Sequence, residues 1–377
     1  MTVALEDVCK RIYAGGDVPK NRYSAVKTEE FSVPIYANAE KDNGLYGYTD
    51  EARENELCIT VAARGTIGFV TIRNEPFLPV VRLITVVPDT TKVSVRYLYY
   101  ALKNSKPKSS GTSIPQLTVP DIKKNRIELF SIENQEKIAD ILDIISNIII
   151  SRRHELQMLD NLIKARFVEM FGDPATNPKG WNKAGISTVM QGKASNGYFA
   201  KRDEYAEEGN VAILGVAYVV NRMYSQVDGL PRTNASVSDI QKYSVKYGDM
   251  LFCRSSLVAE GIGKASIVPE NTPDNTLFEC HVIRLPLDLT KCVPEFMQVL
   301  STTDYFRNQI IAQSKTATMT TIGQDGILKA EIILPPIEKQ REFYSFVKQI
   351  DKSKVAVQKA LDEAQLLFNS LMQKYFG

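Results

Sequence analysis

Residues 132–172 read IENQEKIADILDIISNIIISRRHELQMLDNLIKARFVEMFG, and residues 336–377 read PIEKQREFYSFVKQIDKSKVAVQKALDEAQLLFNSLMQKYFG. The second stretch repeats the first without a gap, in a constant register that carries Ile132 onto Ile337. An internal repeat fixes an architecture more firmly than any single residue can. Two copies are too few for a solenoid, so they predict a molecule with pseudo-twofold symmetry.

Each copy is typical of one long helix, because its apolar residues alternate in steps of three and four and so form a single seam. Each run lasts about 35 residues, or roughly 50 Å at 1.5 Å per residue. Two ordinary core helices are the alternative, but a seam so narrow suits one partner helix. We therefore predict two helices packed antiparallel. The seam comprises Ile138, Leu142, Ile145, Ile149, Leu156, Leu159, Ile163 and Met170 in the first copy, and Phe343, Val347, Ile350, Val357, Leu361, Ala364, Phe368, Leu371 and Tyr375 in the second.

Two blocks rich in Val, Ile, Thr and Tyr, broken by Gly, Pro, Asn and Asp, alternate with the helices. Residues 57–61, 80–87 and 281–285 have the composition of strands with turns between them. Short helices are expected at 95–104 and 294–311, in both cases after the strands of the block. The predicted class is α+β, with two mixed α/β domains at 1–131 and 173–335 separated by two long antiparallel helices at 132–172 and 336–377.

The composition narrows the setting of the protein. The chain has five cysteines, an odd number, and none forms a Cys-x-x-Cys pair. A disulfide framework or a structural zinc site is therefore not expected, and we expect the protein to reside in a reducing cytoplasm. The longest apolar run, 144–150, is too short to span a membrane. The net charge of +2 is almost neutral, so any surface for nucleic acid is expected to be local.

No constellation typical of catalysis stands out. The two histidines, His154 and His281, are more often structural than catalytic in such contexts. The turn 261–264 lacks the spacing of a phosphate-binding loop, and the Asp-Ile-Lys of 121–123 matches only part of a metal-nuclease motif. We therefore predict a protein that binds and does not catalyse, with no metal and no cofactor.

Loops of similar character recur in the same order in both blocks. A Gly/Ser/Thr-rich loop precedes each long helix, at 108–116 and 314–320, and a basic turn follows a strand, at 63–68 and 253–264. Such loops are usually solvated connectors, but their recurrence favours contacts with DNA phosphates and base edges. The candidate DNA-binding residues are Arg64, Thr66, Lys108, Ser113 and Gln116 in the first block, and Lys193, Arg254, Ser255, Lys264, Lys315, Thr316 and Thr318 in the second.

Among these residues, at least one arginine is expected to read a guanine edge, with Arg254 as the candidate in the second block, and the lysines Lys264 and Lys315 are expected to contact phosphate mainly. Arg64 and Gln116 are expected to be the equivalents in the first block.

Three segments make the chain similar to a known family. The run FVEMFGDP at 167–174, followed by NPKGW at 177–181, resembles the central junction of type I restriction–modification specificity subunits. Residues 110–117 resemble the segment that closes their first recognition domain, and residues 334–340 resemble the start of their distal conserved helix. The order of block, helix, block, helix covers essentially the whole chain, although the first block is about thirty residues shorter than the second.

This resemblance implies a function and partners. It implies two target recognition domains, each reading one half of a bipartite sequence in double-stranded DNA, with the helices as a spacer between them. It also implies assembly with two methyltransferase (M) subunits and with restriction/translocase (R) subunits. The alternatives are a cytoplasmic protein–protein scaffold with a helical rod and no nucleic acid, and a nuclease whose site is unrecognised.

Overall fold

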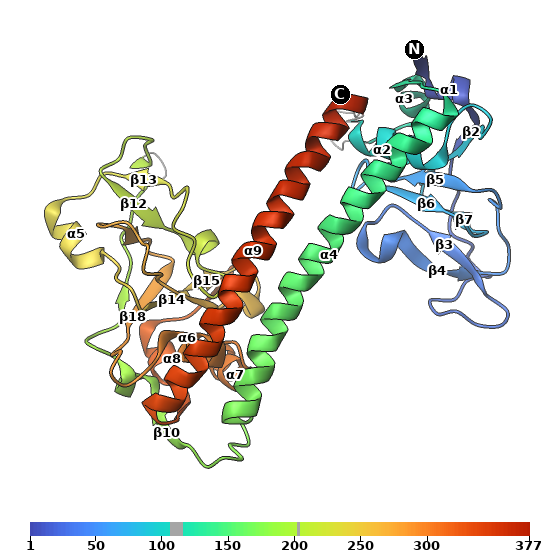
Figure 1. Ribbon diagram of the computed structural model, residues 1–377. Helices are drawn as coiled ribbons and strands as arrows, with labels where there is room; N and C mark the ends of the chain where they lie inside the picture. The colour runs from blue at the N-terminus through green and yellow to red at the C-terminus, as the bar shows by residue number, and fades with distance from the viewer. Residues whose placement is uncertain (106–115, 202–203) are drawn as a thin grey trace. The chain divides into compact units, whose positions relative to one another are not determined.

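The computed structural model describes residues 1–105, 116–201 and 204–377. The chain divides into two compact units (Figure 1). Unit 1 contains Met1–His154 and Gln358–Gly377, and unit 2 contains Glu155–Val357. Each unit therefore combines one of the predicted blocks with a part of both long helices.

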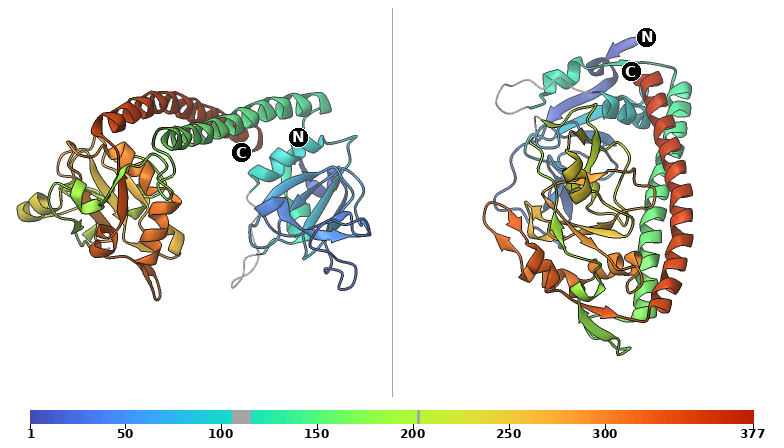
Figure 2. Two further views of the ribbon diagram at one scale, coloured as in Figure 1. Left: turned by 90° about the horizontal axis from the view of Figure 1, so that it is seen from below. Right: turned by 90° about the vertical axis from the view of Figure 1, so that its left-hand side faces the viewer.

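The long helices are α4, Ile132–Phe171, and α9, Ile337–Phe376, within a residue of their predicted limits. Every residue of the two predicted seams is buried or half-buried. Within each unit, the segments of α4 and α9 lie side by side in all three views (Figure 1 and Figure 2).

Contacts inside each unit give the direction of this pairing. In unit 2 the Phe167 and Phe343 rings lie 5.7 Å apart between centroids, and an ion pair of 2.6 Å joins Asp160 to Lys354. The residue number thus rises along α9 as it falls along α4. In unit 1, Ile138 shares a buried cluster with Met372, while Arg153 Nη2 donates to Gln365 Oε1 at 3.4 Å. The predicted antiparallel packing is confirmed within both units.

Unit 1 is built on a four-stranded antiparallel sheet in the order β2-β8-β5-β6. A second sheet has the order β4-β3-β7, with β3 and β7 parallel, and β1 pairs with β9. The elements are β1 (Thr2–Ala4), α1 (Leu5–Val8), β2 (Cys9–Ala14), β3 (Val33–Tyr36), η1 (Lys41–Gly44), β4 (Leu45–Thr49), β5 (Cys58–Val61), β6 (Val70–Arg73), β7 (Leu78–Pro79), β8 (Ile84–Pro88), α2 (Val95–Asn104), α3 (Val119–Lys124) and β9 (Arg126–Glu128).

Unit 2 repeats these three sheets and adds a fourth, with the strand order β15-β20-β19. Its four-stranded antiparallel sheet has the order β11-β18-β14-β16, its second sheet β13-β12-β17 again has one parallel pair, and β10 pairs with β21. The elements are β10 (Asn182–Gly185), η2 (Ile186–Val189), β11 (Ser195–Asn196), β12 (Val211–Leu214), η4 (Val216–Tyr218), β13 (Arg232–Thr233), α5 (Val237–Tyr243), β14 (Asp249–Cys253), β15 (Ser255–Ser256), η5 (Ala259–Gly261), β16 (Ala265–Ile267), β17 (Leu277–Phe278), β18 (Val282–Pro286), α6 (Pro294–Ser301), α7 (Asp304–Ala312), β19 (Lys315–Thr316), β20 (Thr320–Thr321), α8 (Gln324–Leu328) and β21 (Glu331–Leu334).

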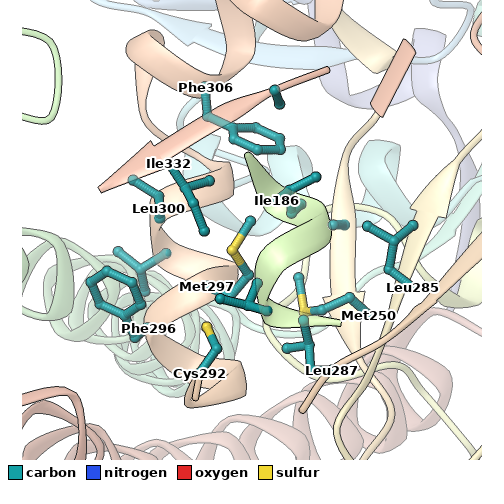
Figure 3. Packing of buried hydrophobic residues seen from close by; sticks show 14 of the residues in the cluster. Ile186, Met250, Leu285, Leu287, Cys292, Phe296, Met297, Leu300, Phe306 and Ile332 are labelled. Atoms are coloured by element: carbon teal, nitrogen blue, oxygen red, sulfur yellow. The ribbon is translucent and has the colours of Figure 1, made fainter. Parts of the chain in front are cut away.

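The core of each unit joins the sheet to the long helices through one short helix. In unit 2, Phe296 of α6 packs against Phe167 and Phe171 of α4, with centroids 5.5 and 4.9 Å away. Figure 3 shows the other side of α6, where Met297 faces Met250 of the sheet. Burial of such side chains contributes about 1.5–3 kcal/mol each. The predicted α+β fold with an internal repeat is confirmed.

Two expected elements differ from the structure. The strand expected at 80–87 is interrupted, because Val81 and Arg82 have φ of 52° and 63°, the left-handed region that ends a strand. Only β8 follows this turn. The helix expected at 294–311 is two helices, since Thr303 starts α7 as an N-cap and accepts from Phe306 N–H.

The junction after α4 explains one stretch of the family-like sequence. Gly172 has φ of 78° and follows α4 in the usual position of a helix-ending glycine. Trp181 Nε1 then donates to the carbonyl of Phe171 at 2.8 Å, and Lys179 Nζ donates to that of Glu169 at 2.7 Å. These side chains satisfy carbonyls that the end of a helix leaves without partners.

Candidate nucleic-acid interface

A small three-stranded ribbon in unit 2 brings together candidate residues that lie about sixty positions apart. Strand β20 pairs with β15 on one side and with β19 on the other, so that both Ser255 and Lys315 lie opposite Thr321. Thr316 pairs with Thr320, and Thr318 lies in the connecting turn. Lys315, Thr316 and Thr318 are exposed. We call β15, β19, β20 and the β19–β20 turn the recognition ribbon.

Arg254 leads into the recognition ribbon and is held by its backbone. Its N–H donates to His281 O at 2.8 Å, and its carbonyl accepts from Ile322 N–H at 3.0 Å. The half-buried guanidinium donates through Nη1 to Cys280 O at 3.2 Å and has no carboxylate partner in the described part of the chain. Ser255 Oγ lies 3.1 Å from His281 Nδ1. The arrangement presents a positive charge and a hydroxyl side by side.

The backbone carbonyl of Lys264 accepts from the N–H of Cys253, next to Arg254, at 2.8 Å. The Lys264 side chain lines a cavity of about 620 Å³ between α4, α6, α7, α9 and the loops around 222 and 264. Its Nζ donates to Asn221 Oδ1 at 2.7 Å. Among the described residues that line the cavity, the one carboxylate is that of Asp160, which is paired with Lys354. We call this space the basic cavity; its cationic lining residues are Lys164, Arg222, Lys264, Arg307 and Lys354.

Apart from Lys354, which is paired with Asp160, the cations of the basic cavity have no carboxylate partner among the described residues that line it. Arg307 Nη2 donates to the backbone carbonyl of Glu260 at 3.1 Å, and Arg222 Nη1 donates to the uncharged Gln226 at 2.7 Å. Burial lowers the pKa of the Arg307 guanidinium below its ordinary value. Several positive charges held by neutral partners favour an anionic ligand.

The candidates of the first block form a smaller group. Arg64 Nε donates to Gln116 Oε1 at 2.8 Å, so the structure brings these two predicted residues together. Thr66 is exposed in the turn between β5 and β6. Lys108 and Ser113 lie outside the described residues.

The hydrogen bonds correct the expected equivalence of Arg64 and Arg254. Leu117 N–H donates to Ala63 O at 2.9 Å, as Ile322 N–H donates to Arg254 O at 3.0 Å. Ala63 therefore corresponds to Arg254, and Arg64 lies one position later, where unit 2 has Ser255. The turns differ by one residue in the placement of arginine, which periodicity cannot reveal.

Lys193 is exposed in the turn before β11, and no contact joins it to the recognition ribbon within the described residues. The other cations of the basic cavity were not predicted, because they come from separate elements and carry no motif: Lys164, Arg222, Arg307 and Lys354. Leu257, which follows β15 and is 83% exposed, was not predicted either. An apolar residue in a polar loop was the available signal.

The described part of the chain has neither a candidate membrane-spanning helix nor a candidate metal-binding cluster. No helix there is both long and apolar enough to cross a membrane. Nor do three or more His, Cys, Asp or Glu side chains of residues 1–105, 116–201 and 204–377 gather in a group that could hold a metal ion.

A duplicated α/β fold, carried on two copies of one helix and bearing exposed basic and hydroxyl side chains, defines a class of two-domain recognition proteins. The model of the type I restriction modification DNA specificity domain matches residues 1–160 and 178–364. The chain belongs to this family, as the resemblance of its sequence predicted.

Known proteins agree with this assignment. A putative type I specificity subunit of Mycoplasma pneumoniae is 37% identical over 139 residues, which cover 37% of this chain and 41% of that protein. The specificity subunit of the type I restriction enzyme MjaIX of Methanocaldococcus jannaschii is 22% identical over 96% of this chain and 86% of its own length. The crystal structure of the S subunit of a type I restriction–modification system from M. genitalium aligns with a TM-score of 0.61 at 13% identity, covering 100% of this chain and 96% of that one, and so shares the fold.

Proposed function

We propose that the chain is the non-catalytic DNA-recognition subunit of a type I restriction–modification complex in the cytoplasm. The observation that carries this proposal is the duplication itself: one fold and one helix occur twice, while the exposed loops of the two blocks differ. Half-sites on a duplex are related by a twofold axis, and dimeric readers match that symmetry. A single chain with two divergent blocks keeps the geometry and reads two different half-sites.

In this proposal the paired strands β15 and β20 of the recognition ribbon enter the major groove, whose width admits a two-stranded β-ribbon. Arg254 reads a base edge, for which guanine is the preferred partner of arginine, and Ser255 and Thr316 supply hydroxyls. The basic cavity, with Lys264, takes backbone phosphates, which fix orientation without reading sequence. In the first block Arg64, one position later than Arg254 in its own turn, and its partner Gln116 contact the DNA.

The helices serve as the spacer and as the docking surface for two methyltransferase subunits, through which restriction subunits join. On the unit 1 part of α4, Ile141, Ile144 and Ile148 are 42%, 60% and 42% exposed, although they lie at helical spacing on one face. Exposed apolar patches of this kind mark sites of protein association. A methyltransferase helix with its own apolar stripe fits that face.

Co-expression with a type I methyltransferase subunit, followed by mapping of methylated adenines, tests the proposal. We expect methylation at a bipartite sequence that changes when either block is exchanged for another. A complex that methylates no defined sequence, together with a purified chain that selects nothing from a pool of random duplexes, would instead support the scaffold alternative.

A further inference from the structure

Three apolar side chains are exposed at the end of the recognition ribbon. Leu257 and Val258 follow β15 and are 83% and 58% exposed, and Met319, just before β20, is 37% exposed. Because Ser256 pairs with Thr320 in an antiparallel ladder, one further step places Leu257 opposite Met319. We call these three residues the apolar tip. The paired positions beneath it carry Ser, Thr and Lys.

The loop that carries the apolar tip has a defined shape. Val258 N–H donates to Ser256 Oγ at 3.3 Å, and Gly261 N–H donates to Val258 O at 3.1 Å, which closes the turn η5. A Cβ atom at Gly261 would lie 2.1 Å from Ser256 Oγ, so the chain passes close to itself here. Leu257 is thus held at the surface by an ordered turn, and it belongs to none of the buried clusters of the described residues.

The surroundings indicate what the apolar tip meets. Arg254 and Lys315 add positive charge, and the serine and threonine hydroxyls of the ribbon add donors and acceptors. A partner that is anionic, rich in hydrogen-bonding groups and apolar only in small spots matches this mixture. The major groove of DNA is such a surface, because each thymine places a 5-methyl group beside its O4 acceptor.

We infer that Leu257 and Met319 read thymine 5-methyl groups in the half-site that unit 2 recognises. This inference rests on the proposed function and adds to it a second kind of base contact. Arg254 would select guanine by hydrogen bonds, while the apolar tip would select thymine by burial of its 5-methyl group.

The test uses the complex of the full chain with its methyltransferase subunits and duplexes of the target found by methylation mapping. Every base pair contains one pyrimidine, so the 5-methyl group can be removed or added at each position of the half-site in turn. Replacing thymine by deoxyuridine removes only the methyl group, and replacing cytosine by 5-methylcytosine adds it. We expect the wild-type complex to lose affinity about fourfold at one or two thymines of the second half-site, the size expected for one buried methyl. If that half-site has no thymine, a 5-methylcytosine facing the tip changes the affinity instead.

The variant Leu257→Ser should lose this response and bind methylated and unmethylated positions alike. Val237→Ser is the matched control, because Val237 is 74% exposed on α5, away from β15 (Figure 1), and should respond as the wild type does. Both side chains are exposed, so both variants should fold, and equal thermal unfolding checks this.

Equal responses of Leu257→Ser and the wild type at every pyrimidine would overturn the inference, while methylation of a bipartite target would still support the proposed function. Lower affinity of Leu257→Ser without any methyl response in the wild type would also overturn it, since the tip would then contact something else. If the wild-type complex binds no duplex at all, the proposed function fails and this inference fails with it.

Discussion

Gln135 and Gln340 occupy the same place in the two copies of the long helix, and each side chain makes the same three hydrogen bonds. Gln135 Oε1 accepts from Ser94 N–H at 2.8 Å, and Nε2 donates to the carbonyls of Lys92 and Phe130 at 3.1 and 2.9 Å. Both glutamines are 0% exposed. One buried amide thus fastens the start of α4 to the short helix α2 and to the chain just before α4.

Gln340 repeats the arrangement in unit 2, with Val293 N–H at 2.9 Å and the carbonyls of Lys291 and Pro335 at 3.4 and 2.8 Å. Gln340→Leu would keep the volume and leave these groups without partners. Since an unsatisfied buried polar group costs about 1–3 kcal/mol, we expect the free energy of unfolding to fall by at least ~2 kcal/mol in urea denaturation.

Gln349→Leu is the control for this variant, because Gln349 lies exposed on the same helix. It should change the stability by less than about 0.5 kcal/mol, as surface substitutions usually do. A similarly small effect of Gln340→Leu would show that the amide does not anchor the helix.

The repeat allowed the sequence to predict the long helices, because a seam such as that of Ile138 and Leu142 depends only on local spacing. It also predicted α2 to the residue. The break at Val81 and Arg82 could not be predicted, since a positive φ at valine follows from tertiary contacts and has no local signal. Even so, both blocks were recognised as mixed α/β.

The candidate site was predicted only in part, for a similar reason. Ser255 and Lys315 were both named, but their common ladder partner Thr321 is a long-range pairing that no periodicity contains. Lys264 was grouped with Arg254 because the two residues are near in sequence. In the structure, however, the Lys264 side chain lines the basic cavity.

Glu54 gives unit 1 a stability that depends on pH. This buried carboxylate accepts from Arg11 Nη2 at 2.9 Å, from Tyr13 OH at 3.0 Å and from the N–H groups of Asn55 and Glu56 at 3.0 Å. Burial alone raises the pKa of Glu54, but these hydrogen bonds outweigh it, and the pKa lies below its ordinary value.

A lowered folded-state pKa means that the unfolded chain binds the proton more tightly. The stabilisation by Glu54 is therefore complete above the ordinary glutamate pKa of about 4.3, and it is lost as the pH falls through the folded-state pKa. Glu54→Gln should be less stable than the wild type at pH 7, and the difference should shrink on acidification when urea unfolding is followed from pH 7 to pH 3. Glu51→Gln, at an exposed position, serves as control. A stability difference between Glu54→Gln and the wild type that stays constant with pH would contradict this role of Glu54.

Arg254 and Lys264 should differ in what they contribute to DNA binding. Arg254→Ala should relax recognition at one position of one half-site, at a cost of about 1–3 kcal/mol against the preferred base, and leave the other half-site unchanged. Lys264→Ala should weaken binding to all sequences and reduce the salt dependence by about one phosphate contact. Competition titrations with single-base variants of the target at several salt concentrations measure both effects. Equal loss at both half-sites for Arg254→Ala would assign the arginine to phosphate or to folding.

The exposed isoleucines of α4 should govern assembly and not folding. The double substitution Ile144→Asp and Ile148→Asp places charges on the apolar face, so we expect the affinity for the methyltransferase subunit to fall at least tenfold, as measured by analytical ultracentrifugation. Thermal unfolding of the isolated chain should hardly change, since both side chains are exposed. Leu289→Asp, at a residue that is 41% exposed in a loop of unit 2, should assemble normally. Undiminished assembly of the double variant would move the docking surface elsewhere.

The two long helices should act as the ruler between the half-sites. Helix α4 and helix α9 each contain residues of both units and are each a single helix through the boundary. Insertion of one heptad after His154 in α4 and another after Val357 in α9, at the boundary between the units, keeps both seams in register. The helices would lengthen by about 10 Å at 1.5 Å per residue, which equals roughly three base pairs at 3.4 Å each.

Mapping of methylated sites for this inserted variant should find both half-sites unaltered and the gap between them longer by about three base pairs. Three base pairs also turn the duplex by almost a third of its 10–10.5 base-pair repeat, so the lengthened target should be bound more weakly than the wild type binds its own. A heptad inserted in α4 alone is the control, because it shifts the seam of α4 against that of α9. This variant should no longer methylate half-sites that are separated by one defined gap. An unchanged gap in the doubly inserted variant would mean that the partner subunits, and not α4 and α9, position the two recognition domains.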